Sequence, residues 1–310
     1  MRTAGAFLRA IPANVKEERM NVKTIAVIGA GTMGRGIAYA AALGGYNTVL
    51  EDVSRQVLEQ GVAWIKQSVA EGVARGKVEG VRDKALSLIS TASNVEDGIR
   101  DAELIIEAVP EELEMKLELF TIFDKFAKTG AIFASNTSSL SITDFTDVTV
   151  SRDRCIGMHF FNPVPKMKLI ELVRTPHTSD ETVATCREVA HRMGKEVVIV
   201  NEAPGFITTR VSALIGNEAF NMLEAGIATP EDIDKAMKLG LDHPMGPFEL
   251  VDLVGLDVRL KILEYLHQTL GEKYRPNSLL RQYVQEGRLG RKTGRGVYDY
   301  PQQRAAEKKG

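Results

Sequence analysis

The chain contains 310 residues, of which 44% are hydrophobic and 26% are charged, and its formal net charge at pH 7 is −2. This composition is typical of a soluble globular protein of one or two domains, and the lack of a basic excess argues against a protein that binds nucleic acid or a membrane surface. No apolar run reaches the roughly 20 residues of a membrane-spanning helix, and the cysteines and histidines lack the spacing of metal ligands, so we predict no metal site and a reducing compartment.

The first segment, residues 1–20, differs in composition from the rest. It contains arginines but no acidic residue before Glu17, which is faintly similar to an organellar transit peptide. Met20 then opens MNVKTIAVIGAGTMG, which has the form of a complete domain start. We therefore expect residues 1–20 to be a disordered leader or a start extension of a cytoplasmic protein, with an organellar matrix protein as the alternative.

Short β-type runs recur in the part of the chain that follows. Helix-type patterns lie between the early runs, and strands that alternate with helices of this length indicate βαβ units on a parallel sheet. The stretch between Asp52 and Leu104 is long for one crossover, so we expect it to form a helical pair that projects from the sheet. The predicted strands are residues 23–29, 47–52, 104–109, 131–136, 155–161, 169–174 and 196–201.

The pattern changes after Pro204, where only helix-type segments follow. TPEDID is a clear helix start, with Thr229 as the N-cap and Pro230 in the first turn. We therefore predict an α/β fold in which a Rossmann-type domain with a mostly parallel sheet, residues 21–202, precedes an all-helical domain, residues 203–310. The helices expected in the second domain are residues 206–226, 230–240, 246–270 and 277–286.

A glycine-rich turn links the first predicted strand to the first helix. The sequence VIGAGTMGRG places Gly29, Gly31 and Gly34 in the GxGxxG spacing, directly after a strand and at the start of a helix. In that context Gly29 permits a tight turn, Gly31 lets the backbone approach a pyrophosphate, and Gly34 allows close packing of helix and strand. The N–H groups of the helix N-terminus, around Thr32 and Met33, would bind the anion and complete a dinucleotide site.

An acidic residue ends the second predicted strand, as dinucleotide binding requires. Asp52 is placed to bind the hydroxyls of the adenosine ribose, and its carboxylate would repel a 2′-phosphate, so NAD is favoured over NADP. Two alternatives stay open at this point. Asp52 would also serve as a simple helix cap, and the adjacent Glu51 is a second candidate for the ribose ligand.

Two ionisable side chains stand in the apolar strands of CIGMHFFNPVPKMKLIELV, residues 155–173. If this stretch folds back as the simplest hairpin, with Phe161 opposite Leu169, then His159 lies opposite Glu171. Opposed residues on paired strands have Cβ atoms about 5 Å apart, close enough for an imidazole–carboxylate hydrogen bond. By itself, such a pair is compatible with either a satisfied polar couple or a functional one.

The sequence SNTSSL places further polar residues, Ser135 to Ser139, where another predicted strand ends. Ligands of open α/β sheets bind at the carboxyl ends of the strands. A turn rich in Ser and Asn is usually only a turn, but beside a dinucleotide site these side chains are candidate ligands.

Together these motifs resemble the L-3-hydroxyacyl-CoA dehydrogenase family, which includes 3-hydroxybutyryl-CoA dehydrogenase. The resemblance extends from about residue 22 to residue 300 and leaves out the leader and the tail. HFFNPVP followed by Glu171 is a highly specific signature. The other matching segments are GAGTMGRGIA, EAVPEELEMK, SNTSSL, PGFI, MGPFELVDLVGLD and GRKTGRGVYDY.

The resemblance implies oxidation of a short-chain L-3-hydroxyacyl-CoA thioester, with His159 and Glu171 as the catalytic pair. His159 would take the proton of the 3-hydroxyl as hydride leaves C3 for NAD, and Glu171 would orient the ring. Ser138 matches a family serine close to the reacting oxygen, where it would contact cofactor and substrate. Further cofactor contacts are implied at Glu111, Lys116, Asn162 and Lys292.

The resemblance also implies how coenzyme A is bound. Ser68, in the expected helical pair, falls on a serine of the family's coenzyme A contact region. Arg75 stands where a lysine is usual, and Lys77 is a second cation suited to a phosphate. Thr209 is a departure, because the family has an asparagine there, so we expect altered substrate positioning without loss of the reaction.

As partners, the resemblance implies an acyl-CoA substrate and a homodimer formed through residues 203–310. Two other functions fit parts of the sequence: a dehydrogenase of a CoA-free hydroxy acid, like the related L-gulonate and carnitine dehydrogenases, and a non-catalytic NAD(H)-binding protein. The helical pair argues against the first, and the intact His159–Glu171 pair argues against the second. Fatty-acid β-oxidation and butyrate metabolism would use the same site.

Overall fold

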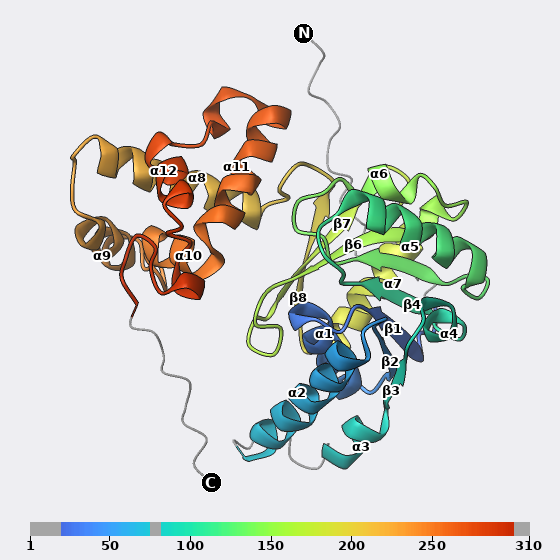
Figure 1. Ribbon diagram of the computed structural model, residues 1–310. Helices are drawn as coiled ribbons and strands as arrows, with labels where there is room; N and C mark the ends of the chain where they lie inside the picture. Colours follow the sequence, from blue (N-terminus) through green and yellow to red (C-terminus); the bar gives the residue numbers. More distant parts are fainter. Residues whose placement is uncertain (1–19, 75–81, 301–310) are drawn as a thin grey trace. The chain divides into compact units, whose positions relative to one another are not determined.

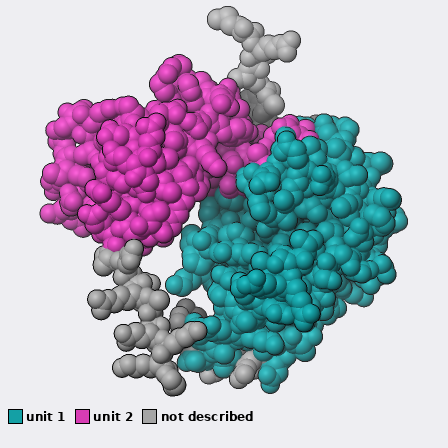
Figure 2. Space-filling model, in the orientation of Figure 1, with its two compact units in different colours: residues 1–136, 145–199 teal, residues 137–144, 200–310 magenta. Residues whose placement is uncertain are grey.

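The computed structural model describes residues 20–74 and 82–300. The chain divides into two compact units, residues 1–136 with 145–199 and residues 137–144 with 200–310 (Figure 2). The division between residues 199 and 200 lies close to the domain boundary that we predicted near residue 202. The sequence did not indicate that residues 137–144, which include most of the serine-rich turn, belong to the second unit.

The first unit is built on an eight-stranded sheet with the strand order β3-β2-β1-β4-β5-β6-β7-β8 (Figure 1). Neighbouring strands from β3 to β6 pair in parallel, and β7 pairs with β6 in antiparallel orientation. The order 3-2-1-4-5-6 is that of a dinucleotide-binding fold, which confirms the predicted fold class. The strands are β1 Thr24–Ile28, β2 Asn47–Glu51, β3 Ile89–Ala92, β4 Leu104–Glu107, β5 Ile132–Ser135, β6 Cys155–Phe160, β7 Leu169–Arg174 and β8 Glu196–Asn201.

Helices pack against both faces of this sheet. Because strand side chains alternate between faces, neighbouring residues of β5 identify the two layers. Ile132 belongs to the buried cluster that contains side chains of α1, α2 and α7, whereas Phe133 packs on Phe120 and Phe123 of α5. The helices around the sheet are α1 Thr32–Leu43, α2 Arg55–Ala74, α3 Arg82–Ser87, α4 Val95–Ile99, α5 Leu113–Phe126, α6 Ile142–Thr146 and α7 Asp180–Arg192.

The long connection between β2 and β4 contains more than the expected helical pair. α2 and the short α3 are followed by β3, an edge strand, and by α4, neither of which the sequence predicted. β3 escaped prediction because its sequence, ISTA, is short and half polar. Asn94 begins α4 by accepting a hydrogen bond from the N–H of Asp97 at 2.9 Å.

The second unit has a helical core of its own, centred on buried aromatic side chains such as Phe220 and Phe248. The predicted helix over 246–270 is two helices, because Gly255, with φ of 106°, interrupts it. Thr229 caps its helix as predicted, accepting from the N–H of Asp232 at 3.2 Å. The helices are α8 Thr208–Glu224, α9 Pro230–Gly240, α10 Pro247–Val254, α11 Leu256–Leu270 and α12 Ser278–Gln285.

Candidate active site

The glycine turn lies between β1 and α1 and requires glycine for steric reasons. Gly29 has φ of 98°, and a Cβ at Gly34 would lie 1.7 Å from the carbonyl oxygen of Gly29. Within the described residues, a Cβ at Gly31 would meet no heavy atom closer than 4 Å, so residues 20–74 and 82–300 leave open space over the turn. Gly31 supplies no side-chain cap to α1, whose first turn holds no acidic residue. This N-terminus therefore fits the pyrophosphate of NAD.

The two acidic side chains at the end of β2 differ in their hydrogen bonds. Asp52 accepts hydrogen bonds from the N–H groups of Ala30, at 2.9 Å, and Ser54, at 2.8 Å, so it joins the glycine turn to the start of α2. Glu51 is 2% exposed and packs against Gly98 of α4. Its Oε1 has no hydrogen-bond partner in residues 20–74 and 82–300, and burial, together with Asp52 and Glu96, raises its pKa to about 7. The Asp52 side chain thus binds the phosphate-binding turn, whereas Glu51 contacts the turn through its backbone carbonyl, which accepts from the N–H of Gly29 at 2.9 Å.

The β6–β7 hairpin brings His159 and Glu171 together. The strands pair with His159 opposite Glu171, which is the register that the sequence predicted. Glu171 Oε2 lies 2.8 Å from Nδ1 of His159, and the two residues are 0% and 6% exposed respectively. The ring of Phe161 packs beside the imidazole, with 4.5 Å between the ring centroids. A carboxylate on Nδ1 fixes the orientation of the ring and assigns proton exchange with a ligand to Nε2.

A second buried charge cluster lies at the carboxyl ends of β4 and β5, and its centre, Glu107, was not among the predicted site residues. Glu107 accepts hydrogen bonds from Lys116 Nζ, at 2.7 and 2.8 Å, from Ser135 Oγ, at 2.6 Å, and from the N–H of Val109, at 2.8 Å. Lys116 is 1% exposed, and its Nζ also lies 3.3 Å from Glu111 Oε2. The signal in the sequence was an acid that ends an apolar strand, as in β2.

The structure thus buries Lys116, whereas Glu111 is exposed and contacts it from the segment that precedes α5. Lys116, on α5, is held inside the first unit by two carboxylates. Asn136, at the end of β5, accepts a hydrogen bond from the N–H of Phe160 at 2.9 Å, next to His159. Asn162 lies two residues beyond the end of β6. Polar groups from β4, β5 and β6 therefore meet at one edge of the sheet, where open α/β folds bind ligands.

Ser138 lies in the turn that belongs to the second unit. Thr137 Oγ1 accepts hydrogen bonds from the N–H groups of Ser139 and Leu140, which closes the turn. Glu202 then binds the residues that follow. It accepts from Ser141 Oγ at 3.1 Å, from the N–H of Thr143 at 2.9 Å, and from the Thr143 hydroxyl.

The remaining predicted site residues belong to different elements of the two units. Thr209 is half-buried in the first turn of α8, and Lys292 forms an ion pair with Asp257 at 2.6 Å within the second unit. Ser68 is half-buried on α2. Arg75 and Lys77 lie outside the described residues.

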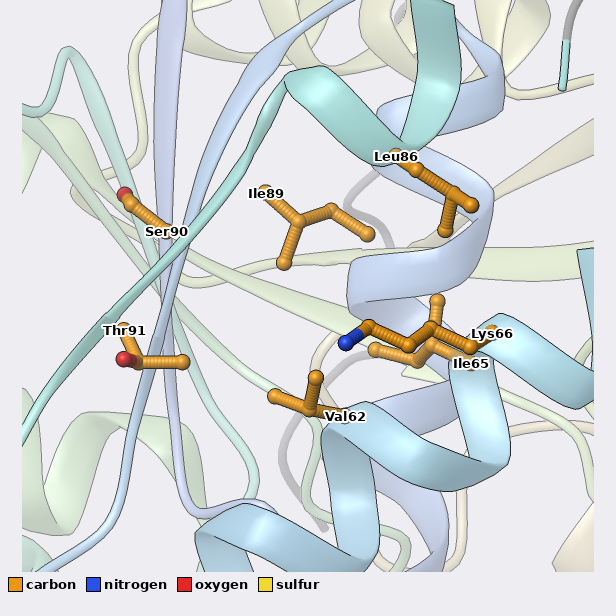
Figure 3. A pocket seen from close by; sticks show the side chains of 7 residues that line it. All are labelled: Val62, Ile65, Lys66, Leu86, Ile89, Ser90 and Thr91. Atoms are coloured by element: carbon orange, nitrogen blue, oxygen red, sulfur yellow. The ribbon is translucent and has the colours of Figure 1, made fainter. Parts of the chain in front are cut away.

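Among the cavities of the structure, one is lined in part by α2, the helix that carries Ser68, and another by the serine-rich turn of the second unit. A cavity of about 350 Å³ separates α2 from α3 and β3, and the ammonium of Lys66 extends into it (Figure 3). A cavity of about 140 Å³ in the second unit is lined by Ser139, Leu140, Ser141, Glu202, Ala203, Pro204, Phe206 and Tyr265. Within residues 20–74 and 82–300 there is no cluster of three His, Cys, Asp or Glu side chains suited to a metal. In the same ranges, no helix is both long and apolar enough to cross a bilayer.

Comparisons with known proteins identify the family to which the chain is similar. The models "3-hydroxyacyl-CoA dehydrogenase, NAD binding domain" and "3-hydroxyacyl-CoA dehydrogenase, C-terminal domain" match residues 24–203 and 205–300. The chain is 46% identical to 3-hydroxybutyryl-CoA dehydrogenase of Bradyrhizobium diazoefficiens, covering 90% of this chain and 96% of that protein. It is 40% identical to the mitochondrial hydroxyacyl-coenzyme A dehydrogenase of Homo sapiens, covering 95% and 98%. The crystal structure of (S)-3-hydroxybutyryl-CoA dehydrogenase from Ralstonia eutropha is similar, with a TM-score of 0.88, 42% identity, and coverage of 91% and 100%.

Proposed function

The chain belongs to the 3-hydroxyacyl-CoA dehydrogenase family, and we propose that it interconverts short-chain L-3-hydroxyacyl-CoA thioesters, such as 3-hydroxybutyryl-CoA, and 3-ketoacyl-CoA. It is an NAD-dependent dehydrogenase. The observation that carries the proposed chemistry is the buried His159–Glu171 hydrogen bond of 2.8 Å near the carboxyl end of β6. A buried imidazole with a fixed orientation suits a reaction that must move one proton.

The residues around the glycine turn would hold the cofactor, which when bound accepts a hydride from C3 of the substrate. The N–H groups at Thr32 and Met33 face the pyrophosphate in this proposal, and Gly29, Gly31 and Gly34 provide the space for it. Asp52 would accept hydrogen bonds from the ribose hydroxyls. Each carboxylate oxygen can accept more than one hydrogen bond, so the bonds from the N–H groups of Ala30 and Ser54 leave lone pairs available for the ribose.

His159 would act as the general base in oxidation. Nε2 takes the proton of the 3-hydroxyl while the C3–H bond breaks and the C3=O bond forms. Glu171 stabilises the imidazolium through Nδ1, and the same proton returns to the oxygen when the reaction runs in reverse. Ser138 would donate a hydrogen bond to the reacting oxygen.

Asn162, Glu111, Lys116 and Lys292 complete the proposed cofactor contacts. The contacts that support a cofactor role differ among these four residues. Lys116 is fixed by Glu107 and lies 3.3 Å from Glu111, so it can orient the Glu111 carboxylate toward a ligand. Lys292 is paired with Asp257, and a contact with the cofactor would require its ammonium to reach a second partner. Ser68, with Arg75 and Lys77, is proposed to contact coenzyme A.

A homodimer through the second unit is part of this proposal. Large apolar side chains are exposed on α8, α10 and α11, which pack on one another and leave these groups in contact with water. They include Val211, Leu253, Val254 and Val258. Analytical ultracentrifugation should give twice the chain mass for the wild type, and Val211→Glu should shift the equilibrium toward monomer. A monomeric wild type at micromolar concentration would refute the dimer.

The test of the function is NADH oxidation with acetoacetyl-CoA, compared with NADPH and with free acetoacetate. Rapid turnover that requires both NADH and the thioester supports the proposal and the ribose role of Asp52. Turnover of free acetoacetate at the same rate would instead indicate a hydroxy-acid dehydrogenase. NADH binding without turnover of either substrate would refute the proposed reaction.

Thr209 is proposed to tune substrate preference. A hydroxyl on a shorter stem replaces the amide that the family has there, so the group that holds the substrate is displaced. Thr209→Asn should change kcat/KM about threefold to tenfold, in a way that depends on acyl length, as expected for one altered hydrogen bond. If the wild type and Thr209→Asn have the same kcat/KM for every acyl group from C4 to C8, this role is refuted.

The cytoplasmic location of the protein and its metabolic pathway remain predictions from the sequence.

A further inference from the structure

An arginine–tryptophan pair lies between α1 and α2. Arg35, in the first turn of α1, places its guanidinium carbon 4.9 Å from the ring centroid of Trp64 on α2. Tyr39, one turn further along α1, meets the Trp64 ring edge-on, with 6.2 Å between the ring centroids. The aromatic rings therefore fix the position of the guanidinium. Both Arg35 and Trp64 are half-buried, so the pair keeps a solvent-facing side.

Arg35 lacks the partner that a buried guanidinium atom normally has. Its Nε is buried without a hydrogen-bond partner in residues 20–74 and 82–300. Burial of an N–H donor costs free energy unless an acceptor compensates for it. An arginine stacked on an aromatic ring presents a rigid fork that matches the oxygens of a phosphate, and little rotational freedom is then left to lose on binding.

The position of the pair on α2 defines the surface that a ligand would use. Trp64 and Ser68 are four residues apart and therefore lie on one side of the helix. Gly61, one turn earlier, packs against the glycine turn, since a Cβ there would lie 3.1 Å from the carbonyl oxygen of Ala30. The flank of α2 that carries Trp64 and Ser68 thus begins at the phosphate-binding turn and runs away from it.

The other basic residues on the described parts of α1 and α2 are directed elsewhere. Arg55 is paired with Glu59 at 2.9 Å. Lys66 extends into the cavity against β3 (Figure 3). Because Lys66 and Trp64 are two residues apart in a helix with 3.6 residues per turn, their side chains leave α2 in nearly opposite directions. Of the basic residues on α1 and α2, Arg35 is therefore the one whose charged group lies at the Trp64–Ser68 flank.

We infer that Arg35 and Trp64 bind the phosphate groups of coenzyme A. This assignment rests on the proposed function, because it requires a coenzyme A thioester as substrate. The NAD pyrophosphate has its own donors at the N-terminus of α1, one helical turn before the guanidinium. Coenzyme A carries an adenosine 3′-phosphate and a diphosphate, and this concentration of negative charge needs cations along its path.

A binding experiment that follows tryptophan fluorescence tests the site directly, because Trp64 is the single tryptophan of the sequence. Coenzyme A added to the wild-type protein should change the Trp64 emission, and pantetheine, which lacks the phosphates, should not. Arg35→Ala should weaken binding of coenzyme A about tenfold, as expected for a charged hydrogen-bond donor at a partly exposed site. Lys66→Ala, a loss of the same charge from the opposite flank, is the matched control and should bind normally. Unchanged emission at saturating coenzyme A would overturn the assignment.

Kinetics separate this site from the cofactor site and from the proposed function. In Arg35→Ala, KM for acetoacetyl-CoA should rise about tenfold, while kcat, KM for NADH, and kcat/KM for acetoacetyl-pantetheine should stay within twofold of wild type. Trp64→Leu should raise the same KM by a smaller factor. A rise in KM for NADH with unchanged KM for the thioester would overturn the inference in favour of the cofactor. If the wild type turns over neither thioester, the proposed function fails, and the fluorescence titration still decides the site.

Discussion

Two buried carboxylates of the same sheet, Glu171 and Glu107, hold basic side chains of different kinds. Glu171 binds the imidazole of His159 across a hairpin, whereas Glu107 binds the ammonium of Lys116 from α5 and the hydroxyl of Ser135 from β5. With Nδ1 bound to Glu171, the imidazole keeps a second ring nitrogen that can accept or donate a proton, whereas the Lys116 ammonium carries only donors, which its acceptors occupy. The first arrangement can therefore take part in proton transfer, while the second can only hold groups in place.

Removal of the Glu107 charge should produce the largest change in stability. Glu107→Gln leaves the buried Lys116 ammonium with Glu111, at 3.3 Å, as its remaining acidic neighbour, and loss of the closer partner of a buried charge costs about 3 kcal/mol of unfolding free energy. Urea denaturation measures the loss. The double variant Glu107→Gln with Lys116→Met removes both charges and should recover most of the stability. Full stability of the single variant would show that the cluster does not need both charges.

Substitution of Glu171 should act on the chemical step instead. Glu171→Gln keeps the shape of the side chain but removes the charge that stabilises an imidazolium. We expect kcat to fall about 100-fold, or about 2.7 kcal/mol in activation free energy, with affinity for NADH and the melting temperature close to wild type. Stopped-flow hydride transfer and NADH fluorescence measure the two effects. A loss of NADH affinity with unchanged kcat would make Glu171 a binding residue like those near the glycine turn.

Glu51 is a third buried carboxylate, and its Oε1, unlike the carboxylate oxygens that bind His159 and Lys116, has no hydrogen-bond partner among residues 20–74 and 82–300. Burial, with Asp52 and Glu96 nearby, raises its pKa from 4.5 to about 7 in the folded chain. The folded state therefore holds this proton more tightly than the unfolded state, so stability falls as pH rises from about 4.5 to 7 and stays lower above 7. Glu51→Gln should be about 2 kcal/mol more stable than wild type at pH 8 and nearly equal at pH 4.5. An equal stability difference at both pH values would contradict this account.

These three carboxylates also show which parts of the structure were predictable from sequence. The His159–Glu171 pair follows from the period of two residues in a strand and from a hairpin that closes within one short stretch. The Glu107 cluster joins β4, α5 and β5, so its partners are set by tertiary packing that no local pattern records. From the sequence alone, Glu51 and Asp52 were both candidates for the ribose ligand, because the side of β2 on which each side chain lies was not known.

The fold shows the same division between local and long-range information. All the predicted strands are present, because each is a short apolar run between turns. β3 was missed, since its sequence is half polar and its pairing with β2 decides its state. One predicted helix is two, because the positive φ of Gly255 is imposed by the turn between α10 and α11. The membership of residues 137–144 in the second unit depends on Glu202, which is distant in sequence.

The most direct test of the central claim is the turnover of His159→Gln with acetoacetyl-CoA and NADH, measured beside its affinity for NADH. Loss of the general base should lower kcat by about 10³-fold, within the range known for positioned acids and bases, while NADH binds as in wild type. A kcat within tenfold of the wild-type value, at unchanged NADH affinity, would show that the proton moves through another group and would contradict the assignment of His159.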